Sequence, residues 1–306
     1  MHALRALRQC CLTFPLRSVT IRSPYVADVQ LQDGSVAMAH APGMELGGVC
    51  VAGARVLLSR NAVGGATKTA FAIQLVASPE GCWIGAHPSL GNKLAAAALQ
   101  RGLLAAALGP HVSARAEATH GRMRVDFELA DAAGARTLLE VKNVVCSDYA
   151  KGSKAGRPKG YDLVYAAAEG EQYRRAAIFP VGKIGQKLED GTRCVSERAI
   201  KHVSELAALT AESNGAVKAR ILTRAMPLMR QVADVLARFA FRAAQAAVLF
   251  VVNRGDCHSV SVRRSSCAAL AAAAARAAAA GVAFHAFRVR WSGSQAHFDG
   301  SVPTDV

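Results

Sequence analysis

Apolar and polar residues alternate in short runs over the first quarter of the chain, from about residue 18 to residue 76. The runs are VTI, YVADVQL, SVAMAH, VCVA, ARVLLS and FAIQLVA, and turn-forming residues such as Asp33-Gly34 separate them. A period of two residues is typical of strands with one buried face. About five such strands in so short a segment predict a small β-barrel of the oligonucleotide-binding type or a fragment of a β-sandwich.

The pattern changes after residue 86, where alanine- and leucine-rich segments alternate with apolar runs of strand length. Periodicity predicts helices over 92–108, 195–212, 227–244 and 266–280, and strands over 123–129, 137–145, 246–252 and 282–289. Strands that alternate with helices indicate an α/β domain. We therefore expect a short N-terminal extension over 1–13, a barrel over 14–85, and an α/β domain over 86–306 with insertions near 147–180 and 211–242.

Composition adds a strong positive charge to this picture. The 306 residues hold 37 Lys+Arg against 22 Asp+Glu, a formal net charge of +15, and 52% of them are hydrophobic, which disfavours general disorder. Residues 1–85 have seven basic and four acidic side chains, so +12 of the charge lies after residue 85. Such a charge predicts attraction to nucleic acid or another anionic surface, and a generally solubilising surface is the alternative.

The sequence also indicates where the protein is found. No run of about 18 uncharged apolar residues is present, so we expect no membrane span. The eight cysteines form no CxxC pair, which disfavours structural zinc, and the lack of a convincing secretory signal favours a reducing compartment. The first 27 residues lack acidic side chains and contain four arginines, a composition that resembles an organelle-targeting segment. We expect an intracellular protein, cytoplasmic or organellar, that is not secreted.

Two neighbouring strands carry the main candidate chemistry. In the first, alternation places Asp126 on one face and predicts that Val125, Phe127 and Leu129 share the other face. In the second, Glu140 and Lys142 are two residues apart and therefore share a face. A hairpin would bring Asp126, Glu140 and Lys142 together.

Two carboxylates at one point repel each other unless a cation or a proton lies between them. Oxygen ligands favour Mg²⁺ or Mn²⁺, so Asp126 and Glu140 are the candidate metal ligands. Lys142 beside them could orient a water for attack on phosphorus. The alternative is ordinary alternation along half-buried strands, with Glu140 and Lys142 forming a weak surface ion pair.

Basic residues gather in two further segments. Arg198, Lys201 and His202 follow Ser196 within one turn of a predicted helix start, where cations and free amides suit a phosphate backbone. A solvated helix face, with Lys201 paired to Glu205, is the alternative. The loop over 147–175 is rich in glycine and basic residues, and its centre contains Lys154, Arg157 and Lys159.

Taken in order, several segments resemble the sugar fermentation stimulation protein A (SfsA) family. They are YVADVQLQDGSVAMAHAP, WIGAHPSLGNKLAAAAL, RMRVDFEL, LLEVKNV, VSERAIKHVSEL and AAVLFVVNRGD. This ordered set spans nearly the whole chain. The family's HxPNTG segment is changed here, because Gly43 and Met44 replace its Asn and Thr, and Ala199 replaces a glycine of its basic helix.

The resemblance implies a fold and a function. It implies an oligonucleotide-binding-like barrel, then an α/β domain similar to PD-(D/E)xK nucleases, and DNA binding with little sequence preference. It assigns catalysis to Asp126, Glu140 and Lys142. Together with the basic segments above, it assigns nucleic-acid contacts to Arg122, Arg124, Lys154, Arg157, Lys159, Arg198, Lys201 and His202.

Three functions remain open from the sequence. We favour a DNA-binding protein with a nuclease-like second domain; the others are an active Mg²⁺-dependent nuclease and a non-enzymatic regulator or scaffold. The sequence leaves open whether the chain forms a homodimer.

Overall fold

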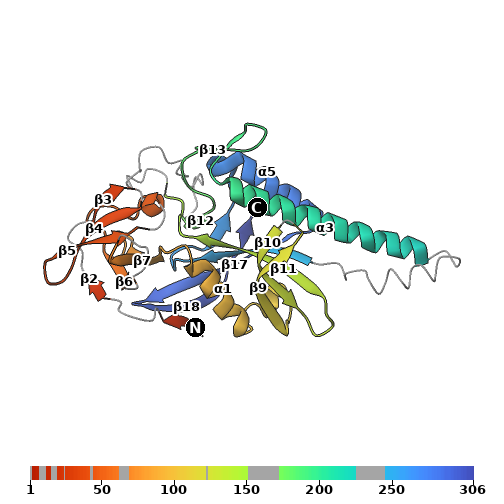
Figure 1. The fold of residues 1–306 in the computed structure, drawn as a ribbon, viewed down its shortest axis with the longest axis horizontal. Coiled ribbons are helices and arrows are strands. Elements are labelled where there is room, and N and C mark those ends of the chain that lie inside the picture. The colour runs from red at the N-terminus through yellow and green to blue at the C-terminus, as the bar shows by residue number, and fades with distance from the viewer. Residues whose placement is uncertain are drawn as a thin grey trace.

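The computed structural model describes residues 2–6, 12–14, 19–23, 25–41, 44–61, 69–121, 123–150, 172–224 and 245–306. The helix predicted over 227–244 and the basic residues Arg122, Lys154, Arg157 and Lys159 lie outside these ranges. Within them, no helix is both long enough and apolar enough to cross a membrane. The fold is mixed α/β (Figure 1).

The first unit is a sheet built from the short alternating runs. Its strands are β2 (Leu12–Phe14), β3 (Val19–Ser23), β4 (Val26–Gln30), β5 (Val36–His40), β6 (Val56–Arg60), β7 (Phe71–Ala77) and β8 (Trp83–Gly85). They pair in the order β2-β6-β7-β5-β4-β3, with β8 beside β7. The run VCVA was predicted as a strand; this was wrong, because it follows the 3₁₀ helix η1 (Met44–Gly47) as a turn, and Gly48 and Gly53 there have positive φ.

The second unit centres on a larger mixed sheet. Its strands are β1 (His2–Ala6), β9 (Ser113–His120), β10 (Met123–Ala130), β11 (Arg136–Val144), β15 (Gln245–Val252), β17 (Ala283–Ser292) and β18 (Gln295–Ser301), in the order β1-β18-β17-β15-β11-β10-β9. The neighbours β11, β15 and β17 are parallel, and the outer pairs are antiparallel. Two small sheets complete the unit, β12 (Ala176–Ile178) with β16 (Ser259–Ser261) and β19 (Thr304–Asp305), and β13 (Gln186–Lys187) with β14 (Arg193–Cys194).

Helices cover both faces of the larger sheet (Figure 1). On one face lies α1 (Leu90–Gln100), followed by the short α2 (Ala105–Leu108); on the other lie α3 (Glu197–Arg224) and α5 (Arg264–Ala280). Even-numbered residues of β15, such as Val248 and Phe250, pack in the core under α3 and α5, and odd-numbered ones, such as Leu249, pack under α1. A strand buried on both faces reads as a continuous apolar run, which is why AAVLFVV predicted it.

The elements predicted after residue 86 that lie in the described ranges are present, but one helix is divided, and the strands β9, β12, β13, β14, β16, β18 and β19 were not predicted. The single helix predicted over 92–108 is divided into α1 and α2, because Gly102 adopts a positive φ in the turn between them. The edge strand β9 was not predicted, because most of its side chains are exposed and the apolar positions of its sequence, SARAEATH, hold only alanine, which is a weak strand former.

The chain begins in the second unit before it builds the first. Strand β1 pairs with β18, and the Leu4 side chain is buried in the core under α1. Residues 2–6 of the predicted N-terminal extension therefore contribute the edge strand of the larger sheet.

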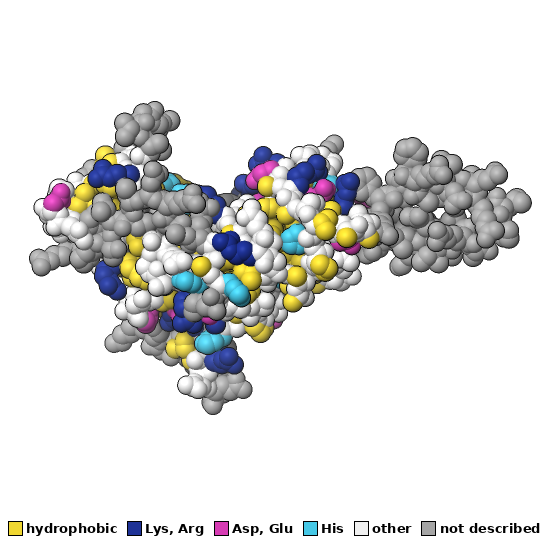
Figure 2. Space-filling view, turned by 90° about the horizontal axis from the view of Figure 1, so that it is seen from below, with side chains coloured by type: hydrophobic (Ala, Val, Ile, Leu, Met, Phe, Trp, Pro, Cys, Tyr) yellow, Lys and Arg dark blue, Asp and Glu magenta, His cyan; other side chains and the backbone are white. Residues whose placement is uncertain are grey.

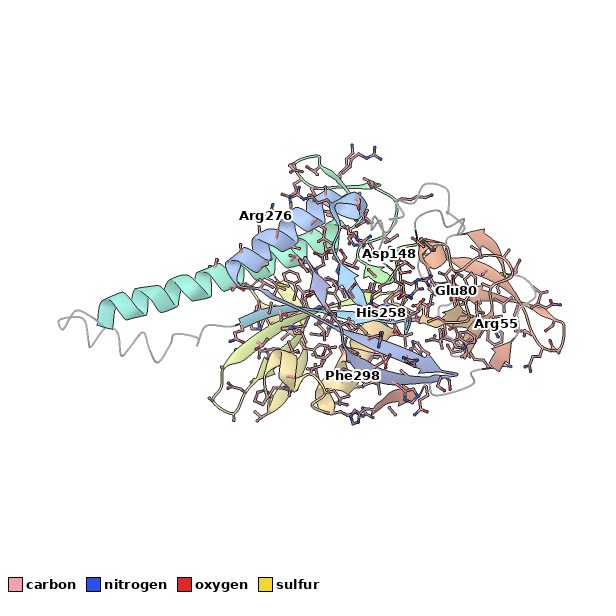
Figure 3. The ribbon with its side chains drawn as sticks, turned by 180° about the vertical axis from the view of Figure 1, so that it is seen from behind. Arg55, Glu80, Asp148, His258, Arg276 and Phe298 are labelled. Atoms are coloured by element: carbon pink, nitrogen blue, oxygen red, sulfur yellow. The ribbon has the colours of Figure 1, made fainter. Side chains whose placement is uncertain are left out.

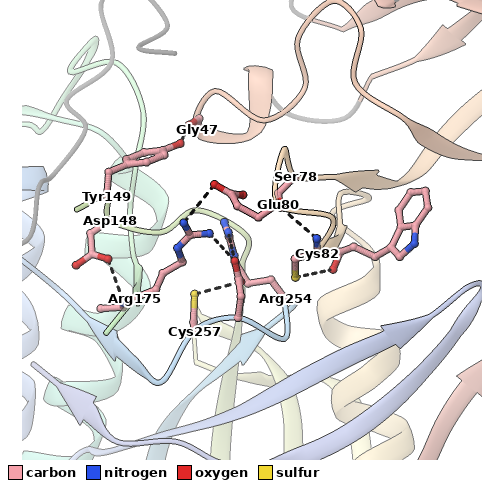
Figure 4. A network of polar contacts seen from close by, with 12 residues as sticks. Gly47, Ser78, Glu80, Cys82, Asp148, Tyr149, Arg175, Arg254 and Cys257 are labelled. Carbon is pink, nitrogen blue, oxygen red and sulfur yellow. Dashed lines mark hydrogen bonds and ion pairs between the residues drawn. The ribbon is translucent and has the colours of Figure 1, made fainter. Parts of the chain in front are cut away.

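Polar contacts join the two units (Figure 4). The Arg254 side chain is 2% exposed and makes a bidentate ion pair with Asp256, while Arg175 contacts both Asp256 and Glu80 of the first unit. The Gly85 amide donates to the Asn253 carbonyl at 2.8 Å. The backbone bond therefore joins the units directly, and among the described residues the ion pair that crosses between them is the one from Arg175 to the exposed Glu80, at 3.6 Å.

Candidate functional site

The candidate site lies where β10 begins to separate from β11. The two strands pair from Phe127–Leu139 to Ala130–Arg136, and beyond this pairing the Val141 amide donates to Oδ2 of Asp126 at 2.7 Å. A carboxylate therefore binds the backbone of the neighbouring strand. Asp126 is held at the position where the hairpin opens.

The alternation predicted for this strand is wrong at Asp126. Val125 packs in the core under α3 and α5, whereas Phe127 and Leu129 pack in the core under α1. The strand is distorted at this point, and Glu117 of the neighbouring strand β9 has a positive φ of 54°. The distortion turns Asp126 toward β11.

Asn92 holds the second oxygen of Asp126. Its Nδ2 donates to Oδ1 at 2.7 Å from the first turn of α1. Burial raises the pKa of Asp126 most, and the charge of Glu140 raises it further. The hydrogen bonds from Val141 and Asn92 only partly oppose this rise. From the sequence, Asn92 is known only as part of the helix start that resembles the family, because its partner Asp126 is 34 residues away.

Glu140 is the most buried member of the site, at 3% exposed. Lys142 Nζ at 2.6 Å and His202 Nδ1 at 2.5 Å both contact its Oε1. A carboxylate only accepts, so Nδ1 of His202 is the protonated nitrogen. Burial acts to raise the pKa of Glu140, but the His202 hydrogen bond and the Lys142 charge outweigh it, and the pKa is lowered.

The other oxygen of Glu140, Oε2, is buried and has no hydrogen-bond partner among the described residues. An unpaired buried carboxylate oxygen costs free energy unless something binds it. The structure thus brings Asp126, Glu140 and Lys142 together, as the hairpin predicted, and leaves one oxygen available to an electropositive ligand.

A pocket of about 630 Å³ lies beside this cluster, between the start of β10 and α3. It is lined by Met123, Arg124, Gln186, Glu197, Arg198, Lys201, His202 and Glu205. Arg198 and Lys201 are exposed, whereas Arg124 is paired with Glu117 at 2.9 Å. Figure 2 shows separate groups of Lys and Arg side chains on one face of the molecule, with acidic side chains beside some of them.

The first turn of α3 positions the basic side chains. Gln186 of β13 accepts the Glu197 amide at 2.7 Å, and the Ser196 hydroxyl accepts the Ala199 amide at 3.4 Å, so two side chains satisfy free amides of the helix start. Ala199, Ile200 and Val203 are buried against the sheet. This leaves Arg198 and Lys201 in solvent, with His202 half-buried and directed at Glu140.

The donor set suits a hard divalent cation better than a soft one. Among the described residues, no three His, Cys, Asp or Glu side chains gather as a metal-binding group, and the six described cysteines are free. The available protein ligands are oxygens of Asp126 and Glu140, which would leave most coordination positions to water or substrate. Mg²⁺ is commonly bound in this way.

A model of the sugar fermentation stimulation protein RE domain matches residues 89–153 and 230–295. A sugar fermentation stimulation protein homolog of Rhodospirillum centenum is 30% identical over 203 residues, covering 66% of this chain and 70% of that protein. A homolog of Pelobacter propionicus is 40% identical over 122 residues, covering 39% of this chain and 51% of its own length.

The chain spans about half the length of the curated relatives that it matches. It covers 51% of the Pelobacter propionicus protein and 58% of a Synechococcus homolog. The solved structure of Pyrococcus furiosus SfsA in complex with Ca²⁺ aligns over 100% of both chains, with a TM-score of 0.66 and 16% identity. At this identity the likeness shows a shared fold.

Proposed function

Because the chain belongs to the sugar fermentation stimulation protein family, we propose that it binds DNA with little sequence preference along the pocket between α3 and β10. The observation that supports this most directly is the exposure of Arg198 and Lys201 beside the carboxylate pair. Glu197 and Glu205 line the same pocket, so the local excess of positive charge is small. Contacts to the phosphate backbone carry no sequence information, which fits a low sequence preference.

Salt dependence tests this proposal. We expect duplex DNA affinity to fall steeply with salt, and Arg198→Ala or Lys201→Ala to reduce the slope of log K against log salt by about 1 each. Arg276→Ala is the matched control, because it removes one charge from an exposed position on α5 (Figure 3). Binding that is absent, insensitive to salt, or equally weakened by all three variants would refute the proposed surface.

A second candidate function is divalent-cation-dependent hydrolysis of phosphodiesters. It is favoured by Oε2 of Glu140, a buried acceptor without a partner, beside a second carboxylate. Asp126 and Glu140 would hold Mg²⁺ or Mn²⁺, and the complex of the Pyrococcus furiosus protein with Ca²⁺ supports a divalent ion. When bound, the cation would supply charge that stabilises a phosphate as negative charge develops on it.

This chain's own residues would bind the water and the phosphates and hold the metal ligands in place. Lys142, already placed against Glu140, would hold a water or a phosphate oxygen by hydrogen bonding. Arg198 and Lys201 would bind the flanking phosphates and orient the strand. Asn92 and the Val141 amide keep Asp126 in place.

Cleavage assays separate this function from binding alone. With Mg²⁺ or Mn²⁺, we expect the parent to cut DNA, and Asp126→Asn or Glu140→Gln to reduce the rate by at least about a hundredfold, a loss typical of charges that stabilise a transition state. Glu189→Gln, an exposed loop change, is the control. If calorimetry detects no divalent-cation binding, a non-enzymatic regulator or scaffold becomes the better description.

A further inference from the structure

The two carboxylates of the site are held from opposite faces of the sheet. Asn92 comes from α1 on one face and binds Oδ1 of Asp126, and His202 comes from α3 on the other face and binds Oε1 of Glu140. Each contact joins residues far apart in sequence, 34 and 62 positions respectively. Neither contact is needed to form the hairpin, which β10 and β11 build with their own backbone pairs.

The two contacts hold both carboxylates in fixed orientations. Glu140 is 3% exposed, and Asp126 is half-buried. At Glu140, both donors converge on Oε1 and none of the described residues reaches Oε2. This one-sided bonding fixes the rotation of the carboxylate and directs its free oxygen.

We propose that Asn92 and His202 are positioning residues, which orient Asp126 and Glu140 as oxygen ligands for a hard divalent cation. This inference rests on the cation-dependent function proposed above. Lys142 reaches the same oxygen from the strand that carries Glu140, but it is two residues away and moves with that strand. His202 instead ties the ligand to α3, the helix that also carries the basic side chains of the pocket.

Partners that orient metal ligands typically change metal affinity by 10–100-fold when they are removed. We therefore expect His202→Leu and Asn92→Leu each to weaken Mn²⁺ binding at least about tenfold, as measured by calorimetry on the full chain without nucleic acid. His202→Asn places an amide N–H near the position of Nδ1 and should restore most of the affinity. Electron paramagnetic resonance of bound Mn²⁺ gives a second readout that does not depend on activity.

The controls separate orientation from folding. Ser204→Ala and Gln100→Ala change exposed positions of α3 and α1 that make no contact with the carboxylates, and should bind Mn²⁺ as the parent does. Thermal unfolding with a chelator should show the His202 and Asn92 variants folded, and Mn²⁺ should raise their melting temperatures less than that of the parent.

The inference is overturned if the parent binds no Mn²⁺, if His202→Leu binds it with the parental affinity, or if His202→Asn is as weak as His202→Leu. Failure of the proposed function has a different outcome in the cleavage assay and the salt titration. A parent that binds Mn²⁺ in a His202-dependent way but cuts no DNA supports the positioning role and refutes the nuclease, and the salt titration of Arg198 and Lys201 tests DNA binding in chelator.

Discussion

At the scale of single residues, Asp126 and Glu140 are each held by a contact from the hairpin and by a contact from a helix. The sequence was enough to predict that Asp126, Glu140 and Lys142 lie close together. They are on adjacent strands joined by a short turn, and strand pairing fixes their distance. The contacts of Asn92 and His202 could not be predicted from the sequence, because they depend on how two helices pack on opposite faces of the sheet. His202 was expected to face phosphate, and its Nδ1 is occupied by Glu140.

The mutual influence of the carboxylates gives a prediction at this scale. Glu140→Gln removes the charge that helps to raise the pKa of Asp126, so that pKa should move down toward its ordinary value while burial keeps it from falling fully. Titration of the Asp126 carboxyl carbon by NMR measures it. An unchanged titration would mean that the two groups do not interact in solution.

At the scale of elements, apolar periodicity predicted the long buried strands and the helices, and it missed the exposed edge strand β9 and short strands such as β12. The sequence pattern predicted β15 because both faces of that strand are covered. It did not predict β9, because β9 is an edge strand with five exposed residues in succession. The alternation of β10 failed at Asp126 for a related reason. Periodicity assumes a regular strand, and the side-chain bond to Val141 forms where the strand is distorted.

The close packing of α1 on β11 gives a second prediction. A Cβ at Gly91 would lie 2.8 Å from the Cβ of Asn143, and neither atom can rotate away. Alanine would gain about 1 kcal/mol of helix propensity, but overpacking of this kind costs about 1–3 kcal/mol. Gly91→Ala should therefore unfold at lower denaturant, and should weaken Mn²⁺ binding by displacing Asn92. Gly185→Ala, which meets little around it, is the control.

At the scale of the whole molecule, basic side chains lie both on the surface and near the junction of the two units. Most of the +15 was assigned by sequence to the second unit as a phosphate-binding surface. The structure uses part of it internally, since Arg254 and Arg175 are bound to acids at the junction. Net charge alone could not distinguish these roles, because burial and pairing are properties of the fold.

The junction gives a pH-dependent prediction. Burial acts to raise the pKa of Asp256, but the hydrogen bonds and charges of Arg254 and Arg175 outweigh it and hold the pKa well below 3.8. The stabilisation is therefore complete above about pH 4 and is lost as the pH falls toward the native pKa. Asp256→Asn leaves Arg254 buried without its charged partner and should cost about 3–5 kcal/mol at pH 7.

Denaturant unfolding from pH 7 to pH 2 measures this effect. The difference between parent and Asp256→Asn should shrink as the pH falls, because the parent then loses the same interaction. Glu212→Gln, an exposed change on α3, should follow the parent at every pH. A constant difference would place the destabilisation in lost packing rather than in charge.

The path of the chain through β1 has a consequence for how the protein can be divided. Because β1 pairs with β18 before the first unit begins, that unit is an insertion within the second one rather than a module in front of it. A fragment that starts at residue 86 would lack an edge strand, expose the unpaired backbone of β18, and be prone to self-association. A single proteolytic nick between the units should instead leave both pieces held together, and they should co-elute until denatured.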